Sequence, residues 1–234
     1  MPISFVDYRI NKNEEANLKK LGVEIIKCPP CKQLYQAICG HPDMILHIIN
    51  NKKIIVNKDI DKNFISKLNS FNIDVILSKN SLKIKYPYDI ILNAVSMDYL
   101  FFHYINYTDP NLLLQLNNKK QISVKQGYTK CSTAIINSKA IITSDKSIDA
   151  AMKKENIDSL LLPPGDILLP GFDYGFIGGC CGMVTEKEMA FYGNLNYYKY
   201  GKEVLNFLYK YNVKPIFLSD GKLIDRGSIL TINI

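Results

Sequence analysis

Long apolar segments are the first thing that this sequence of 234 residues lacks. No hydrophobic run reaches the roughly 18 residues that a membrane-spanning helix needs. The start, Met1 to Ser4, also lacks the basic and apolar regions of a secretory signal peptide. We therefore expect a cytoplasmic protein without a membrane partner, and its 47% of hydrophobic residues is ordinary for a chain with a core of its own.

Arginine is scarce as well. The formal net charge is +7, but every basic residue except Arg9 and Arg226 is a lysine. The sequence has no RNP-type motif, no zinc-finger spacing and no basic block with interleaved aromatic residues, so the charge indicates a solvated, lysine-rich surface. Nucleic acid is therefore not an expected partner. A GKS/GKT phosphate loop and a GxGxxG fingerprint are also missing, and we predict no nucleotide or other cofactor.

The six cysteines do not indicate a disulfide framework, because such frameworks belong to short secreted chains. Cys28-Pro29-Pro30-Cys31, followed by Cys39 and His41, has the ligand types of a zinc site and the spacing of a redox dithiol. The favoured interpretation is a connecting loop with buried thiols and no metal. A metal site and a redox pair remain the two alternatives.

What the sequence does contain is an internal repeat. Residues 40–55 align without gaps to residues 127–142, and both segments predict a strand, a tight turn with an asparagine and a second strand. A third copy starts at Gly175. The segments 87–95 and 99–102 predict a fourth hairpin in the long gap between the first two copies.

A second signal repeats in step with the hairpins. Apolar residues at helical spacing end at Gly or Asn, the residues that most readily adopt the left-handed conformation at the end of a helix, and an apolar strand follows at once. Five such helix-to-strand joints are predicted. Four lie at 18–25, 68–75, 152–158 and 208–213, and a looser fifth lies at 114–124.

The repeating unit is then strand, strand, helix, strand, five times over. The N-terminal segment 3–9 supplies only the second strand of a hairpin, and the C-terminal segment 229–232 is a lone strand after the fifth joint. The simplest arrangement is a ring closed by pairing of the last strand with the first, which removes exposed sheet edges. We therefore predict one α/β domain over residues 1–234.

Five such units with circular closure, together with Gly40-His41-Pro42-Asp43 and the segment 126–132, resemble the pentein superfamily. The resemblance implies a five-bladed α/β propeller of ββαβ units, as in the guanidine-modifying deiminases, hydrolases and amidinotransferases. A translation initiation factor that binds the ribosome shares this fold without catalysis. In such a ring the side chains near the start of each inner strand converge on the centre, namely Asp43, Asp89, Lys130-Cys131, 178–181 and 225–228.

The family chemistry needs a cysteine thiolate, a histidine that shuttles protons and carboxylates that bind the cation. Asp43 and Asp89 match the positions of the carboxylates. The segment 127–130 stands where the family histidine is expected, and 225–228 stands where the nucleophilic cysteine is expected, and neither contains that residue. Arg226 would also repel a guanidinium, so standard deiminase or hydrolase chemistry is not expected.

Other residues keep an enzyme under consideration. Cys131 lies beside Lys130, whose ammonium would lower the pKa of the thiol. Cys180 and Cys181 lie on opposite faces of a predicted strand, so one of them could face the centre. His41 is two residues from Asp43 and could form a proton-transfer pair with it. The predicted catalytic residues are thus Cys131, His41 and Lys130, and the predicted substrate-binding residues are Asp43, Asp89, Tyr128, Arg226 and Cys180.

The function expected from these residues is that of a pentein-fold protein whose polar central pocket binds a small metabolite, with a cationic guanidine or amino-acid-like molecule as first candidate. Any reaction would be a guanidine-modifying-type hydrolysis or transfer by a non-standard thiol. The alternative is a non-catalytic protein- or RNA-binding module on the same fold, since the family histidine and cysteine are missing. The oligomeric state stays open.

Overall fold

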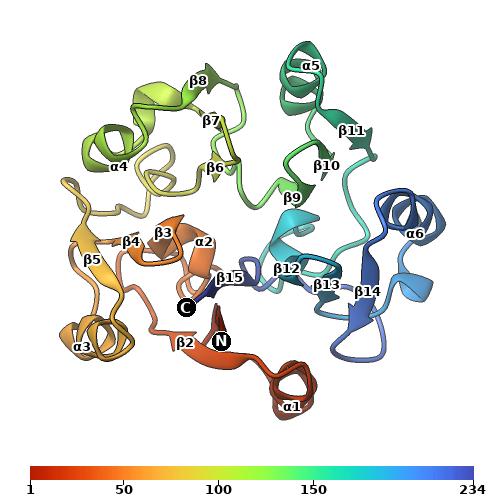
Figure 1. The fold of residues 1–234 in the computed structure, drawn as a ribbon, viewed down its shortest axis with the longest axis horizontal. Coiled ribbons are helices and arrows are strands. Elements are labelled where there is room, and N and C mark those ends of the chain that lie inside the picture. The colour runs from red at the N-terminus through yellow and green to blue at the C-terminus, as the bar shows by residue number, and fades with distance from the viewer.

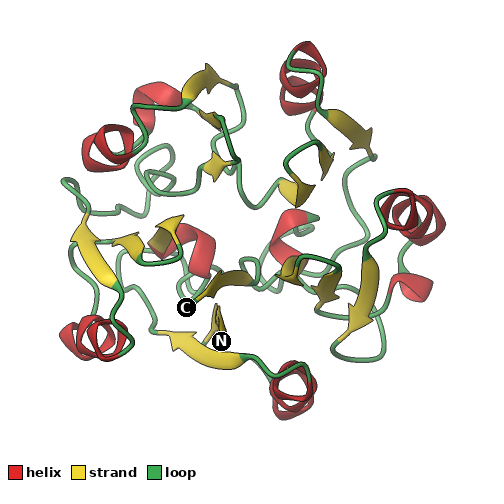
Figure 2. Ribbon diagram, viewed as in Figure 1, coloured by secondary structure: helices red, strands yellow, loops and turns green.

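The computed structural model describes residues 1–234, which form fifteen strands, six α-helices and three short 3-10 helices. The strands build five separate three-stranded sheets. Figure 1 shows these sheets around a common centre, and Figure 2 shows most of the helices at the outside of the molecule. The α/β class and the five sheets predicted from the sequence are therefore present. No helix is long and apolar enough to cross a membrane.

Four sheets have the same order along the chain: an antiparallel hairpin, a helix, and a third strand parallel to the second. Their elements are β3 (Leu46–Asn50), β4 (Lys53–Val56), α3 (Lys62–Ser70) and β5 (Asp74–Leu77); β6 (Val95–Ser96), β7 (Leu100–His103), α4 (Pro110–Gln115) and β8 (Lys120–Ser123); β9 (Thr133–Asn137), β10 (Ala140–Thr143), α5 (Lys146–Lys154) and β11 (Asp158–Leu161); β12 (Cys181–Thr185), β13 (Glu188–Phe191), α6 (Gly201–Lys210) and β14 (Lys214–Phe217).

The fifth sheet joins the two ends of the chain. It contains β15 (Leu230–Asn233), β1 (Pro2–Asp7) and β2 (Glu24–Cys28), and α1 (Lys12–Lys20) connects the last two. β1 is antiparallel to β15 and parallel to β2, so this sheet has the element order of the other four when the chain end is read before the start. The predicted pairing of the last strand with the first is present.

Four helix-to-strand joints contain the left-handed residue that the sequence predicts. Gly22, Asn72, Asn156 and Asn212 have φ angles of 74°, 56°, 58° and 56°. Each follows the last turn of its helix and precedes the next strand by one or two residues, which ends the helix and turns the chain toward the sheet. The joint after α4 has no residue with positive φ.

The segments just before the inner strands differ from prediction. A short helix, α2 (Pro42–Ile45), replaces the first part of the strand predicted from residue 40, because Pro42 occupies the first helical position. The strand predicted over 87–95 is mostly turn, and β6 begins only at Val95. The three 3-10 helices are η1 (Ile105–Tyr107), η2 (Gly178–Cys180) and η3 (Leu195–Tyr197).

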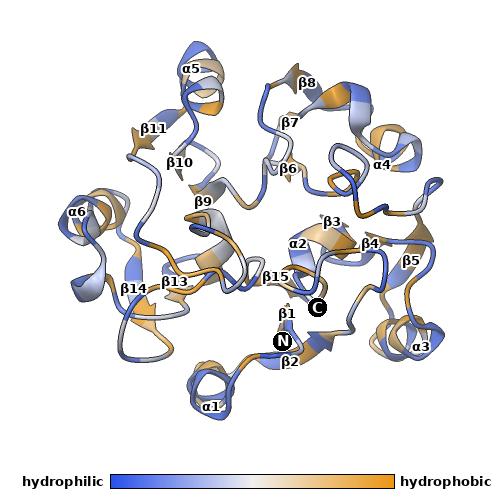
Figure 3. Ribbon diagram, turned by 180° about the vertical axis from the view of Figure 1, so that it is seen from behind, coloured by the Kyte–Doolittle hydropathy of each residue, from blue (hydrophilic) through white to orange (hydrophobic).

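The core lies between the sheets and the helices that cover them. One cluster of buried side chains joins Ile3 of β1, Ile55 of β4 and Phe101 of β7, so three sheets share it. A second cluster joins Ile142 of β10 and Phe191 of β13. The outer helices carry both hydrophilic and hydrophobic residues (Figure 3), as expected of helices with one buried face. This packing holds the inner strands β3, β6, β9, β12 and β15 in place, and the residues before them meet near the centre.

Candidate functional site

Side chains from four connections form a hydrogen-bonded group near the centre of the molecule. Asp43 Oδ2 lies 2.6 Å from Ser228 Oγ and 3.3 Å from Cys131 Sγ. Lys130 Nζ donates to Ser228 Oγ over 3.0 Å. The convergence that the sequence predicts for Asp43, Lys130-Cys131 and 225–228 is therefore observed. We call Asp43, Asn93, Lys130, Cys131 and Ser228 the central cluster.

Asn93 holds two of these connections together. Its side-chain amide donates to the backbone oxygen of Asp43 and lies 3.1 Å from Cys131 Sγ. Its side-chain oxygen accepts from the backbone N–H groups of Lys130 and Cys131. Asn93 is fully buried, so all of these bonds form away from water and fix the backbone around Cys131.

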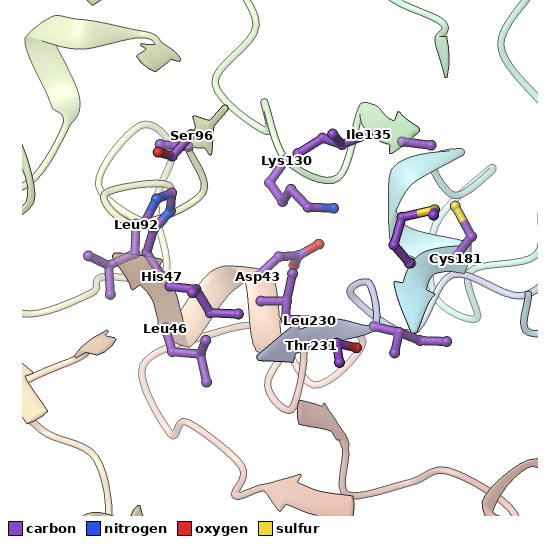
Figure 4. Close-up of a pocket in the computed structure, with 16 residues that line it drawn as sticks. Asp43, Leu46, His47, Leu92, Ser96, Lys130, Ile135, Cys181, Leu230 and Thr231 are labelled. Atoms are coloured by element: carbon purple, nitrogen blue, oxygen red, sulfur yellow. The ribbon is translucent and has the colours of Figure 1, made fainter. Parts of the chain in front are cut away.

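One cavity, the channel cavity, lies among the inner strands and has a volume of about 260 Å³. Asp43, His47, Ser96, Lys130 and Thr231 supply its polar atoms, and apolar side chains of β3, β9, β12 and β15 form most of the remaining wall. Figure 4 shows Asp43 and Lys130 next to one another, with His47 on one side and Cys181 on the other. Burial lowers the pKa of His47 to about 4, so its ring is neutral near pH 7.

A second cavity, the aromatic pocket, also has a volume of about 260 Å³ and is lined by a different set of residues. Its walls come from α2, from the connection before β9 and from the long connection between β11 and β12. The lining comprises four aromatic rings (Tyr128, Phe172, Tyr174, Phe176), three aliphatic or thioether side chains (Ile38, Met44, Leu169), and His41, Cys131, Asp173 and Asp225. The two adjacent residues Lys130 and Cys131 therefore contact different cavities.

His41 lies between two carboxylates in the wall of the aromatic pocket. Its Nδ1 is 3.7 Å from Asp225 Oδ1, and its Nε2 is 3.9 Å from Asp7 Oδ2. The ring is 1% exposed, and neither nitrogen has a hydrogen-bond partner. The predicted pairing with Asp43 is not observed: His41 is the N-cap of α2, Asp43 lies in its first turn, and the carboxylates facing His41 are those of Asp7 and Asp225.

Asp225 is the buried carboxylate of the aromatic pocket. It accepts hydrogen bonds from the backbone N–H groups of Phe176 and Gly227 over 2.8 and 2.9 Å. Burial raises the pKa of Asp225, and the neighbouring His41 lowers it. A Cβ atom at Gly179 would lie 2.1 Å from Asp225 Oδ1, so only glycine at that position leaves room for this carboxylate.

Cys131 is not the Lys130-activated thiol that its position in the sequence predicts. Burial raises the pKa of the Cys131 thiol well above its ordinary value, and the nearby carboxylates of Asp43 and Asp225 raise it further. The Lys130 ammonium instead contacts Ser228 Oγ and the backbone oxygen of Thr133. The prediction that Lys130 lowers this pKa is therefore wrong.

Asp89 and Asp43 do not share a cavity, contrary to the prediction. Asp89 is fully buried and accepts a 2.6 Å hydrogen bond from the hydroxyl of Tyr128. Asp89 lines neither the channel cavity nor the aromatic pocket, whereas Tyr128 lines the pocket. Burial raises the pKa of Asp89. Its place is behind the pocket wall, where it orients Tyr128.

Two other predicted binding residues also lie outside both cavities. Arg226 forms an ion pair with the buried Glu14 at 3.1 Å and lies over the ring of Tyr192, so its guanidinium points away from the centre. Cys180 is packed in the apolar core, and burial raises the pKa of its thiol. Cys181, its neighbour, lines the channel cavity.

The Cys28-Pro29-Pro30-Cys31 segment contains neither a disulfide nor a metal-ligand cluster. All six cysteines are free, and no group of three or more His, Cys, Asp or Glu side chains is placed to hold a metal ion. Cys31 donates to Gln33 and Cys39 donates to the backbone oxygen of Gln36. Cys28 is fully buried. The arrangement is that of a loop with buried thiols.

Three contributors to the site were not among the predicted site residues. Ser228 belongs to the segment predicted to converge, but nothing in the sequence distinguished it from Arg226. Asn93 gave no signal, because a lone asparagine beside a predicted strand is usually a turn residue. Asp225 belongs to the same converging segment, and nothing in the sequence distinguished it from its neighbours.

Solved structures with a similar fold include three that are named as enzymes. An agmatine deiminase of C. jejuni is 11% identical, with a TM-score of 0.56 over 93% of this chain and 87% of that chain. A dimethylarginine dimethylaminohydrolase of Pseudomonas aeruginosa complexed with citrulline is 8% identical, with a TM-score of 0.55 over 92% and 90%. An amidinotransferase from the saxitoxin pathway of Microseira wollei is 11% identical, with a TM-score of 0.54 over 87% and 72%.

These neighbours are pentein superfamily members, so this chain has the pentein fold that the sequence resembles. Identities this low establish the fold alone. Comparison with curated proteins finds no match. A family model described as "Family of unknown function (DUF6873)" matches residues 5–230, nearly the whole chain, and the protein belongs to that family.

Proposed function

We propose that the protein binds a small organic cation, with a guanidinium or ammonium head group, in the aromatic pocket. The observation that carries this proposal is the charge of the pocket wall. Its two carboxylic side chains are Asp173 and Asp225, and no lysine or arginine lines it. The walls attract a cation and offer no basic side chain to an anion.

The aromatic rings support the same conclusion. Tyr128 and Phe176 stack with ring centroids 6.1 Å apart, and Tyr174 meets Phe176 edge-on at 6.4 Å. A cation over the face of such a ring gains about 0.5–1 kcal/mol at an exposed site and about 2 kcal/mol when it is desolvated. A carboxylate adds a charge-assisted hydrogen bond with a preferred direction. The names of the structural neighbours, agmatine deiminase and dimethylarginine dimethylaminohydrolase, refer to guanidine compounds and favour a guanidinium.

If the protein is an enzyme, Cys131 is the residue that we assign to the covalent step. It lines the pocket together with His41 and Asp225. A cation bound beside Cys131 would favour its thiolate, because an opposite charge within about 4–6 Å lowers the pKa of an acid. We no longer assign a catalytic role to Lys130, because its side chain lines the channel cavity and not the aromatic pocket. Asp43 stays as the acceptor of the Cys131 thiol proton.

The proposal also treats residues 1–234 as one domain, a closed five-bladed propeller. Pairing of β1 with β15 supports this closure. In that arrangement the aromatic pocket lies at one mouth of the centre and the channel cavity lies among the inner strands. The central cluster then lies between them.

The direct test compares N-methylguanidinium with N-methylurea, which have nearly the same shape and differ in charge. Isothermal titration and thermal unfolding should show binding and stabilisation by N-methylguanidinium alone. Asp225→Asn should abolish the preference, while Asp59→Asn, at an exposed carboxylate that does not line the pocket, should keep it.

A second variant, at the pocket rim, provides a test that does not depend on the folding of Asp225→Asn. Phe172 is 49% exposed, so Phe172→Leu should fold and should weaken N-methylguanidinium binding by about 2- to 5-fold through loss of the ring face. Equal binding of the two probes, or of neither probe, would overturn the proposal. Binding of neither would favour the non-catalytic protein- or RNA-binding module.

A further inference from the structure

We infer that the ligand of the aromatic pocket carries no carboxylate and has an apolar body, so that its class is an alkyl- or aryl-substituted guanidine or amine and not an amino acid. This inference rests on the proposed function. It concerns the part of the ligand beyond the cationic head. The structure supports it because no lysine or arginine lines the pocket and the ring nitrogens of its one histidine both face carboxylates.

Three basic side chains that neighbour the pocket in sequence or in space are committed elsewhere, and one of them, Arg226, pairs with Glu14. Lys130 contacts Ser228 Oγ and Thr133 O in the channel cavity. Arg9 lies behind Phe172, in the wall of a neighbouring surface cavity. Its Nε and Nη2 bond to Asp7, and its Nη1 and Nη2 bond to the backbone oxygens of Gln36 and Ala37. Each guanidinium nitrogen of Arg9 therefore has a partner.

Several backbone donors of the lining, a group that often binds carboxylates, are also taken. The N–H groups of four lining residues donate to protein acceptors, namely those of Met44 to His41 O, Tyr128 to Gln126 Oε1, Phe172 to Leu169 O and Phe176 to Asp225 Oδ2. The Tyr128 hydroxyl donates to Asp89. A carboxylate in this pocket would lose its water without gaining comparable donors, which is costly for a charged group.

The field of the pocket opposes a carboxylate as well. His41 lines the pocket, and neither of its ring nitrogens has a hydrogen-bond partner. Its Nδ1 lies 3.7 Å from Asp225 Oδ1, and its Nε2 lies 3.9 Å from Asp7 Oδ2. A third carboxylate near His41 would be repelled by Asp7 and Asp225. The exposed Asp173 at the rim repels it too. By contrast, the same carboxylates attract a cationic head.

The apolar part of the lining determines the size and the apolar character of the ligand beyond its cationic head. Ile38, Met44 and Leu169 lie with the four rings, and all three are 8% exposed or less. A dry apolar cavity of about 150 Å³ is large enough for benzene. The aromatic pocket, at about 260 Å³, therefore has room for a butyl or phenyl group beside a guanidinium. Burial of about four methylene groups strengthens binding of such a ligand.

The experiment is a titration series at one pH and ionic strength, with N-methylguanidinium as the reference for the head group alone. We expect 1-butylguanidine to bind at least 10-fold more tightly than N-methylguanidinium and at least about 30-fold more tightly than L-arginine. L-Arginine methyl ester, which lacks only the carboxylate charge, should recover at least 5-fold of that loss. Agmatine should bind between 1-butylguanidine and L-arginine.

A variant with reversed charge at the pocket rim tests whether the lack of a cationic side chain weakens the binding of L-arginine. Asp173→Arg supplies the missing cation at an exposed position, so it should raise the affinity for L-arginine relative to 1-butylguanidine by about 10-fold, and Asp173→Asn should give a smaller shift in the same direction. L-arginine binding more tightly than N-methylguanidinium to the unmodified protein would overturn this inference and leave the proposed function intact. Failure of all the guanidines to bind would instead overturn the proposed function.

Discussion

The channel cavity and the aromatic pocket have the same volume and nearly touch through the central cluster, yet they are built differently. Side chains of the inner strands form most of the channel cavity, so its shape follows from the sheets. The aromatic pocket is formed by α2 and by connections, with no strand residue in its lining. Binding residues are common on connections that a rigid scaffold positions. This difference in construction favours the aromatic pocket as the proposed recognition site, with the channel cavity as part of its scaffold.

Charge separates the two cavities as clearly as architecture does. Lys130 and Asp43 both line the channel cavity, whereas the aromatic pocket has carboxylates and no lysine or arginine. Lys130 and Cys131 are neighbours in the chain but contact different cavities. The two residues lie in the turn before β9, which directs their side chains apart, so neighbours in sequence need not belong to one site.

Low pH is expected to produce the largest effect, and it acts on two buried histidines, of which His47 lines the channel cavity. Burial lowers the pKa of His47 to about 4 and the pKa of His103 to about 3, against about 6.5 in the unfolded chain. The unfolded state therefore binds more protons below pH 6.5, and stability falls as the pH falls. Each histidine should contribute a loss of about 2 kcal/mol between pH 7.5 and pH 5.

Urea unfolding at several pH values measures this loss. His103→Gln and His47→Gln should each remove about half of the pH dependence above pH 5. The raised pKa values of Asp89 and Asp225 act in the opposite direction at lower pH, because those carboxyls hold their protons more tightly in the folded state. Unchanged pH dependence in both histidine variants would contradict the assignment.

The next largest effect is expected at Gly178, which packs against the segment that separates the cavities. A Cβ atom there would lie 2.3 Å from the backbone oxygen of Thr133 and 2.4 Å from that of Lys130. Backbone atoms cannot yield as a flexible side chain can, so Gly178→Ala should cost about 3 kcal/mol of unfolding free energy.

The matched control for that substitution is Gly165→Ala. Gly165 has a φ of 103° and no atom within 4 Å of an added Cβ, so only backbone strain of about 1–2 kcal/mol is expected. Chemical denaturation of both variants gives the comparison. A Gly178 variant as stable as the Gly165 variant would show that the segment around Lys130 and Thr133 can shift.

The smallest effect should come from Lys130→Met, which changes one side of the central cluster. Loss of the contacts with Ser228 and Thr133 should lower the free energy of unfolding by about 1 kcal/mol. Binding of N-methylguanidinium, measured by calorimetry, should change by less than about 3-fold, because the ammonium contacts the other cavity. A 10-fold change in affinity would show that the two cavities act as one site.

The parts of the fold that local chemistry determines were predictable. Gly and Asn at the ends of four helices predicted the helix-to-strand joints, and Gly22 and Asn72, for example, have the expected positive φ. The sheet with β6, β7 and β8 was harder, since its joint has no such residue. Its inner strand shortens because the segment before Val95 forms turns, and one of these places the Asn93 side chain on Asp43 and Cys131.

The candidate site was predictable in position and only partly in identity. Asp43 and Cys131 converge because each precedes an inner strand, which the repeat shows. Arg226 points outward and Ser228 inward although they are two residues apart, because Gly227 and Ser228 both have a φ of 72° and the segment is not extended, which no pattern in the sequence reveals. The raised pKa of Cys131 depends on burial among distant residues, so its neighbour Lys130 gave the wrong expectation.

Pairing of β1 with β15 has a consequence for how this molecule assembles. The register joins Pro2 to Asn233, the most distant contact along the chain that any of the sheets makes. Closing a loop of that length carries the largest entropy cost of any strand pairing here. We expect this sheet to form last, once the other four have brought the ends together (Figure 1). Pairing of β1 with β15 should therefore be found only in molecules in which the other four sheets have already formed.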